Sequence, residues 1–238
     1  MIITRKSQVT PLLEACLNSF ENQDSVALIK QIDYQILSKK VKFPLLEFCA
    51  ITLFESTPNH VQLDLCRKIG DLNREGGNVL IGKILQLRLE QNFESSLNEA
   101  VYHIAKGKEW YVSDLIGERV FGVALLTQPI LCFPFLNQLT NHTSNWVVRS
   151  IGSGTHYAIK KGLDYNSSKD MFHILLKLSN TRDYQIKRGI GWAAKTCAKF
   201  HPQIIYDLEE KLKDDPSIGT WFKTKVKIGL ARHAHAQL

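Results

Sequence analysis

The chain has 238 residues, of which 44% are hydrophobic and 22% are charged, an ordinary composition for a globular protein. No apolar run of signal-peptide length follows the first residues, MIITRKSQVT, and no stretch approaches the roughly eighteen apolar residues of a membrane span. We therefore expect a cytoplasmic, nucleoid-associated protein with no membrane partner.

The positive charge is concentrated in the later part of the chain. Residues 1–100 contain 11 Lys or Arg against 12 Asp or Glu, whereas residues 101–238 contain 19 against 11. A one-sided basic surface is the electrostatic footprint of a nucleic-acid-binding protein, because each neutralised phosphate releases condensed counterions. A basic face that only keeps the protein dissolved would give the same balance, so charge alone leaves both interpretations open.

Helical patterns fill the chain, and alternating strand patterns with hairpin turns are scarce. Most prolines stand at or near the start of an apolar-periodic segment, where a missing N–H group costs nothing. The expected helices cover residues 9–21, 24–37, 43–55, 59–70, 77–90, 94–105, 110–126, 129–139, 144–161, 168–178, 183–199, 202–212 and 217–234.

These elements predict an all-α fold. No low-complexity linker divides the chain, so we expect a single domain over residues 1–238, with an irregular helical cap over 1–75 and regular repeats over 80–234. The segment GDLNREGGN (70–78) is the clearest loop. A second glycine pair, Gly152-Ser-Gly154, lies inside a helical pattern and predicts a close helix crossing rather than a dinucleotide site.

Four aromatic residues recur at nearly equal spacing. Trp110, Trp146, Tyr184 and Trp221 are separated by 36, 38 and 37 residues, and each opens a segment with an amphipathic pattern. Spacing of about 35 to 45 residues is typical of stacked helical repeats, in which each helix pair buries its apolar face against its neighbours. The spacing therefore predicts a solenoid of helix pairs.

Metal and nucleophile signals are weak. The five cysteines are scattered, odd in number and without a CxxC pair, which favours buried small hydrophobes over a disulfide framework or a zinc site. Among the eight histidines no HExxH spacing occurs, and the close pair His233 and His235 is interpreted as incidental. No GxSxG motif is present. We expect no metal and no cofactor.

The remaining chemistry consists of carboxylates, aromatic rings and cations at helical spacing. Trp110 and Asp114 are four residues apart and therefore share one helix face. If the repeats stack, Arg149 and Trp192 from later repeats can line the same concave wall. The alternative is that the tryptophans belong to the core and the charges to solvated surface.

Three segments of the chain resemble those of a known protein family. The segments KEWYVSDLIGERVFG (108–122), NWVVRSIG (145–152) and DYQIKRGIGWAAKTCAKFHPQII (183–205) resemble the bacterial DNA alkylation repair proteins, the AlkD-like DNA glycosylases. The resemblance covers roughly residues 80–232. It implies a right-handed-type α-α superhelix of HEAT-like repeats. It also implies hydrolysis of the N-glycosidic bond of N3- and N7-alkylated purines in double-stranded DNA by a monomer.

The resemblance implies roles for single residues. Trp110 resembles the family's first sugar-contacting tryptophan, Asp114 its catalytic aspartate, Arg149 its arginine at the DNA backbone and Trp192 its second active-site tryptophan. The family commonly reads Trp-Asp-x-x-Asp where this chain has Trp110-Tyr-Val-Ser-Asp114. An alignment shifted by one would place Tyr111 at the aromatic position, so Tyr111 is also a candidate DNA contact.

The implied chemistry suits a sparse site. An alkylated purine carries positive charge and leaves without a proton donor, so one carboxylate that stabilises the sugar cation and positions water is sufficient. Indole faces would add cation–π attraction of about 1 to 2 kcal/mol each when desolvated. Basic side chains would follow the duplex backbone without reading sequence. They are Lys187, Arg188, Lys195, Lys223, Lys225 and Arg232.

Two other functions remain open at this stage. One is a non-catalytic helical-repeat protein that binds DNA structures, which the shifted alignment at Tyr111 favours. The other is a protein-binding helical scaffold with incidental basic charge, a common use of repeat solenoids.

Overall fold

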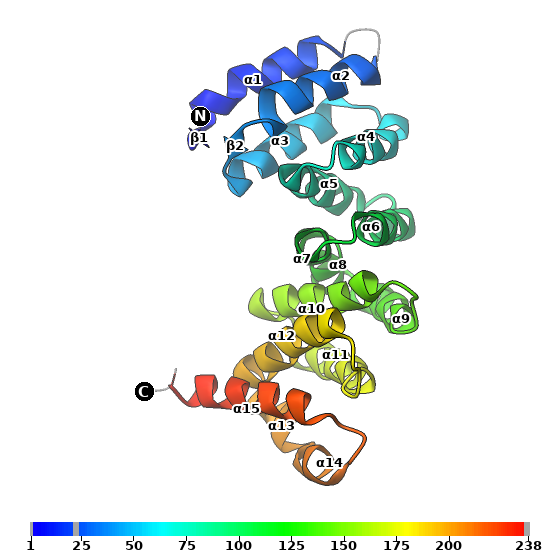
Figure 1. Ribbon diagram of the computed structural model, residues 1–238, viewed down its shortest axis with the longest axis vertical. Helices are drawn as coiled ribbons and strands as arrows, with labels where there is room; N and C mark the ends of the chain where they lie inside the picture. The colour runs from blue at the N-terminus through cyan, green and yellow to red at the C-terminus, as the bar shows by residue number, and fades with distance from the viewer. Residues whose placement is uncertain (1, 21–23, 236–238) are drawn as a thin grey trace. The chain divides into compact units, whose positions relative to one another are not determined.

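The computed structural model describes residues 2–20 and 24–235, and this part of the chain is almost entirely helical (Figure 1). The exception is a short parallel strand pair, β1 (Ile2–Ile3) and β2 (Lys40–Val41), in which Ile2 lies opposite Lys40. The expected all-α class is confirmed at the level of secondary structure. Within the described residues, none of the helices is long and apolar enough to cross a membrane.

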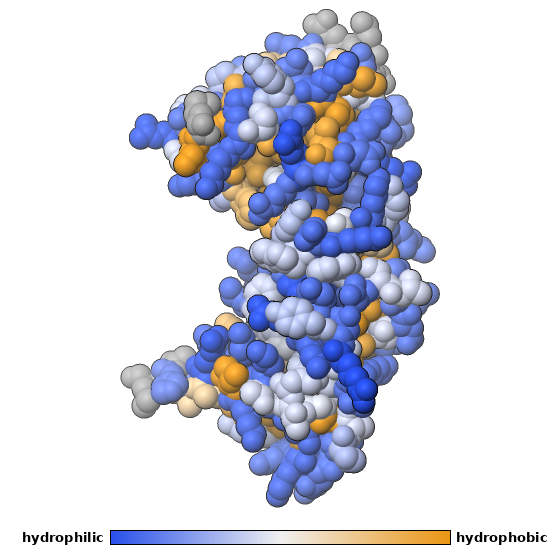
Figure 2. Space-filling view, in the orientation of Figure 1, coloured by the Kyte–Doolittle hydropathy of each residue, from blue (hydrophilic) through white to orange (hydrophobic). Residues whose placement is uncertain are grey.

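The chain forms two compact units, unit 1 (Met1–Gly107) and unit 2 (Lys108–Leu238). The single domain with a cap over 1–75 and repeats over 80–234 stays a prediction. Figure 2 shows hydrophilic side chains over most of the visible surface of each unit, with hydrophobic patches between them.

Unit 1 packs its helices around leucine and isoleucine side chains, among which Leu53, Leu65 and Leu80 are fully buried. Asp24 begins the second helix by accepting hydrogen bonds from two backbone N–H groups of the first turn. The helices are α1 (Lys6–Asn18), α2 (Ser25–Gln31) with the π-helical segment η2 (Ile32–Leu37), α3 (Phe43–Ser56), α4 (Asn59–Asp71), α5 (Glu75–Arg88) and α6 (Phe93–Gly107).

Unit 2 contains one row of helices, α7, α10, α12 and α15, each of which packs against the next (Figure 1). Its largest fully buried side chains are Phe121, Phe172 and Phe222, and burial of each stabilises the unit by about 1.5–3 kcal/mol. The helices are α7 (Trp110–Arg119), α8 (Phe121–Thr127), α9 (Pro129–Leu139), α10 (Asn145–Lys160), α11 (Tyr165–Lys177), α12 (Tyr184–Phe200), α13 (Pro202–Tyr206), α14 (Glu209–Asp214) and α15 (Thr220–His235).

The aromatic spacing marks the starts of the row helices. Trp110 and Tyr184 are the first residues of α7 and α12, and Trp146 and Trp221 are the second residues of α10 and α15. The prediction that each aromatic residue opens a helix is confirmed. Because equivalent positions begin neighbouring helices, side chains one turn further along can meet between them.

Glycines allow the backbones of the row helices to touch. A Cβ atom added at Gly152 of α10 would overlap the backbone of Gly189 of α12, and one added at Gly229 of α15 would overlap the carbonyl group of Lys195. Only glycine fits such close approaches. The close crossing predicted from Gly152-Ser-Gly154 is therefore confirmed.

Several predicted boundaries differ from the structure, and the helix expected over 202–212 is divided into α13 and α14. The expected helix 110–126 is divided at Val120 (φ −96°, ψ −63°), which separates α7 from α8 although its N–H still donates to the carbonyl four residues back at 2.8 Å. The loop expected over 70–78 is shorter, because α5 begins at Glu75. Asn73 makes the turn with a positive φ of 51°, a conformation that asparagine adopts more readily than most residues.

All five cysteines are buried and free. Burial raises the pKa of Cys132 and of Cys197 to about 12, so their thiols stay protonated and unreactive at neutral pH. The interpretation of the cysteines as small buried hydrophobes is confirmed.

Candidate active site

A hollow of about 330 Å³ opens between the row helices of unit 2. Residues from α7, α10, α12 and α15 form its wall, so every helix of the row contributes at least one side chain. The lining residues are Trp110, Asp114, Arg149, Arg188, Gly191, Trp192, Lys195 and Lys225.

Asp114 is the carboxylate of the hollow, and three donors orient it. The guanidinium of Arg149 donates from Nε to Oδ1 at 3.0 Å and from Nη2 to Oδ2 at 2.7 Å. The hydroxyl of Ser153 donates to Oδ1 at 2.6 Å. A bidentate, charge-assisted pair of this kind fixes the carboxylate plane as well as its position. The side chain of Asp114 keeps 14% of its surface exposed, so it remains reachable from the hollow.

Arg149 lies deeper than its partner, with 8% of its side chain exposed. Its Nη1 group donates to Oε1 of Gln185 at 3.0 Å, so neighbours on α7 and α12 hold the guanidinium together. A charge buried to this extent requires such partners. Arg149 was predicted to contact the DNA backbone; in the structure its guanidinium faces Asp114, and the phosphate contact stays a prediction.

Two indole rings line the same hollow as the carboxylate. Trp110 stands one helical turn before Asp114 on α7 and exposes 56% of its surface. Trp192 of α12 is half-buried, and the imidazole of His156 stacks on it with ring centroids 3.8 Å apart and an interplanar angle of 26°. Both rings and the carboxylate therefore share one surface, as the sequence predicted.

Tyr111 was a candidate DNA contact from the shifted alignment. In the structure its ring packs edge to face against Trp110, with centroids 5.9 Å apart, while Trp110 is the aromatic side chain that lines the hollow with Asp114. The geometry favours the unshifted alignment, and a DNA contact by Tyr111 stays a prediction.

Three basic side chains line the hollow and a fourth, Arg232, lies close enough to act on Lys195; we call Arg188, Lys195, Lys225 and Arg232 the cationic cluster. Burial lowers the pKa of Lys195, and the positive charges of the other three members lower it further. Among the described residues, no carboxylate forms an ion pair with any member of the cluster. Crowded cations without counter-charges make a site for anions.

The other two predicted backbone contacts, Lys187 and Lys223, make separate contacts of their own. Lys223 donates from Nζ to the carbonyl oxygens of Lys213 at 3.0 Å and Asp215 at 3.2 Å, in the segment before α15. Lys187 places its ammonium 6.0 Å from the ring centre of Trp221. The structure thus brings four of the six predicted cations together.

Sequence reasoning did not identify Ser153, His156, Gln185 or Thr196. A signal was available for two of them, because Arg149, Ser153 and His156 follow a spacing of four and three residues on a helix that is otherwise small or apolar on that face. Buried polar residues at such positions require partners. Gln185 and Thr196 carry no comparable mark in the sequence.

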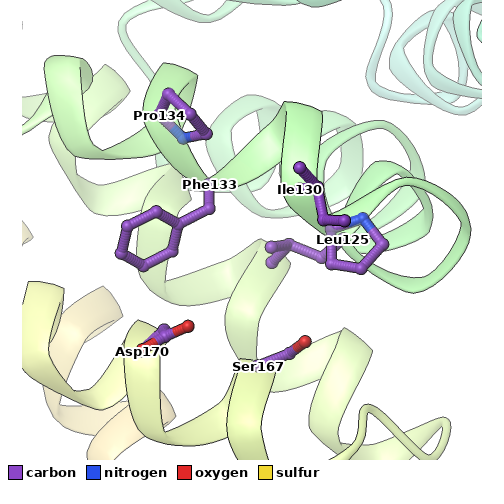
Figure 3. A pocket seen from close by; sticks show the side chains of 7 residues that line it. Leu125, Ile130, Phe133, Pro134, Ser167 and Asp170 are labelled. Carbon is purple, nitrogen blue, oxygen red and sulfur yellow. The ribbon is translucent and has the colours of Figure 1, made fainter.

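A second hollow, of about 280 Å³, lies between α8, α9 and α11 (Figure 3). Leu125, Ile130 and Phe133 face Ser167 and Asp170 across it. It contains no basic side chain and no predicted site residue. Within the part of the chain that the structure describes, no group of three His, Cys, Asp or Glu residues is placed to hold a metal ion.

Comparison with known proteins identifies a family. A family model described as DNA alkylation repair enzyme matches residues 46–208, a range that includes the carboxylate, both indoles and the arginine of the hollow. A search of curated proteins found no match. Lys225 and Arg232 lie outside the matched range.

Proposed function

The chain belongs to the DNA alkylation repair enzyme family, and from this premise we propose that it is a DNA glycosylase that hydrolyses the N-glycosidic bond of N3- and N7-alkylated purines in duplex DNA. Membership gives the chain an enzymatic role in DNA repair, with DNA as the substrate. The proposal adds the bond that is cleaved, the alkylated duplex and the residues that act.

The carrying observation is one oriented carboxylate in a hollow that two indole rings also line. An alkylated purine is a cationic leaving group, so cleavage requires stabilisation of the positive charge that develops on the sugar rather than an acid. Asp114 can provide the negative charge that stabilises the sugar cation, and it can hold a water molecule beside C1′. Trp110 and Trp192 attract a cationic base or sugar through their ring faces.

Arg149 has a positioning role in this proposal. Asp114 accepts two of its five N–H donors and Gln185 a third, which leaves donors for a phosphate beside the lesion. The cationic cluster binds the following phosphates without reading sequence. We further propose that a monomer acts in the cytoplasm, near the nucleoid, and that the row helices belong to a right-handed superhelix of HEAT-like repeats.

The test is base release from methylated DNA. The purified protein is expected to release 7-methylguanine or 3-methyladenine, and Asp114→Asn is expected to lower the rate at least about 100-fold while DNA binding survives. Glu99→Gln is the matched control, because Glu99 pairs with an arginine in unit 1 outside the hollow. Release by Asp114→Asn at the original rate would overturn the mechanism.

A second candidate is a DNA-structure-binding protein without catalysis. It is favoured by the enclosure of Asp114, whose oxygens already accept three hydrogen bonds. Salt-sensitive binding to bent or branched DNA, with no base release from any methylated substrate, would establish this function instead.

A further inference from the structure

His156 and Thr196 form a connected set of contacts with Trp192. His156 of α10 is buried, stacks on the indole at 3.8 Å between centroids and places Nδ1 2.6 Å from Oγ1 of Thr196. The hydroxyl of Thr196 donates its single proton to the carbonyl of Trp192 at 3.0 Å. Nδ1 of His156 must therefore be protonated and donate the hydrogen bond to Oγ1 of Thr196. Ring and backbone of Trp192 are thus both tied to one imidazole.

The same face of α10 supports both parts of the site. Arg149 and Ser153 hold Asp114, and His156, one turn further along, holds Trp192. The carboxylate and the indole come from different helices, so their separation depends on this shared support. A displaced indole would leave the hollow wall although Asp114 kept its hydrogen bonds.

We propose that His156 is a positioning residue that backs Trp192 and makes the hollow select cationic over neutral nucleobases and sugars. The substrate in this inference rests on the proposed function, whereas the stacking and the hydrogen bonds of His156 are independent of it. A ring held parallel to a supporting ring presents only its other face to a ligand, and that electron-rich face attracts cations.

The charge of His156 matters to this role. Burial lowers its pKa to about 4, the positive charges of Lys160 on α10 and Lys195 on α12 act in the same direction, and Asp114 on α7 opposes them. The imidazole is therefore neutral at physiological pH. A cationic ring at this position would weaken the attraction of the indole for a second cation.

The first experiment tests the stacking of His156 on Trp192 without depending on catalysis. A protonated imidazole quenches the fluorescence of a stacked indole, so emission of the intact protein is expected to fall with a midpoint near pH 4. His156→Phe keeps an aromatic backing but cannot titrate, and Trp192→Phe removes the reporter; both should lack this transition. His173→Phe, on α11, is the control and should retain it. A transition that persists in His156→Phe would overturn the stacking.

The second experiment measures selectivity. Duplexes with a pyrrolidine nucleotide, which mimics the sugar cation, are compared with duplexes that contain the neutral tetrahydrofuran analogue. His156→Ala is expected to reduce the preference for the cationic duplex about tenfold, with binding of undamaged DNA within twofold. His156→Phe should restore most of it, and Thr196→Val should give a smaller loss. An unchanged preference in His156→Ala would overturn the inference, whether or not the protein releases bases.

Discussion

Both units contain a side-on pair between an arginine and a largely buried carboxylate, but the arginine is exposed in one pair and buried in the other. In unit 1, Arg67 donates to both oxygens of Glu99 at 2.8 Å, and the side chains are 55% and 5% exposed. In unit 2, Arg149 and Asp114 are 8% and 14% exposed. The pair in unit 1 buries its carboxylate and leaves its arginine in solvent. The pair in unit 2 buries most of both side chains, the arginine slightly deeper, and its carboxylate lines a hollow.

The difference shows how one interaction can serve two purposes. Glu99 lies beside His103 within the helices of unit 1, where the pair joins α4 to α6. Asp114 is oriented by groups beneath it and keeps a surface that a ligand can reach. A buried arginine that supports an accessible carboxylate is a device for presenting negative charge, whereas the reverse arrangement mainly stabilises the fold.

The largest expected effect comes from removing each arginine. Arg149→Met leaves Asp114 without its main partner and is expected to lower the free energy of unfolding by about 3–5 kcal/mol and base release at least about 100-fold. Arg67→Met removes an exposed side chain, and Glu99 keeps its contact with His103, so the change should cost about 1 kcal/mol with release unchanged. Denaturant unfolding and single-turnover release measure both. Equal losses of release would show that the two pairs do not differ in purpose.

The two units also differ in how closely their helices approach each other at glycine residues. Gly152→Ala in unit 2 places a Cβ atom on the backbone of Gly189 and is expected to cost about 3 kcal/mol. Gly77→Ala in unit 1 meets the Cγ2 methyl group of Ile69 at 3.1 Å, so this neighbour has to shift by only a few tenths of an ångström. It gains up to about 1 kcal/mol of helix propensity and should be near neutral. A tolerant Gly152→Ala would mean that α10 and α12 can separate.

The sequence predicted the helices well because their signals are local. Apolar periodicity and proline positions depend on neighbouring residues, and the aromatic spacing located the starts of four row helices. The division at Val120 was missed because it is a local change of backbone angles that leaves no mark in the apolar pattern of the sequence. The shorter loop before α5 was missed because paired glycines normally indicate turns, although Gly76 and Gly77 begin a helix here.

The site was predictable only in part. Trp110 and Asp114 lie on one helix, so spacing alone placed them together. The pairing of Asp114 with Arg149 joins residues 35 positions apart, and its direction of burial depends on how α7 and α10 pack. Lys187 and Lys223 show the same limit, because the ring and the carbonyl groups that they contact depend on how the chain packs.

Acid should weaken the two units in different pH windows. The pKa of His156 falls from 6.5 to about 4 on folding, so the unfolded chain binds the proton first, and unit 2 loses about 2 kcal/mol as pH falls from 6.5 to 4. Burial raises the pKa of Glu99, but contacts with His103 and Arg67 outweigh this and lower it from 4.5 to about 2. Its stabilisation is complete above pH 4.5 and is lost as pH falls towards 2.

All four tryptophans belong to unit 2, which separates the two windows experimentally. Denaturant unfolding followed by tryptophan emission reports unit 2, and far-ultraviolet circular dichroism reports both units. His156→Phe should flatten the pH dependence of the emission midpoint between 6.5 and 4. Glu99→Gln should leave that midpoint unchanged and remove the loss at lower pH. A reversed order of the two windows would contradict the assignments.

The smallest expected effect concerns DNA affinity, where the units differ in net charge. Unit 1 has 12 basic against 12 acidic residues and unit 2 has 18 against 11. Lys225→Gln removes one member of the cationic cluster, so it should weaken binding to undamaged duplex by up to about tenfold at low salt and reduce the salt slope by about 1. Lys227→Gln, about 200° around the same helix, and Lys83→Gln, on α5 of unit 1, are the matched controls and should change neither quantity. If Lys83→Gln lowers the slope as much as Lys225→Gln does, both units contact the phosphates and the charge difference does not define the binding surface.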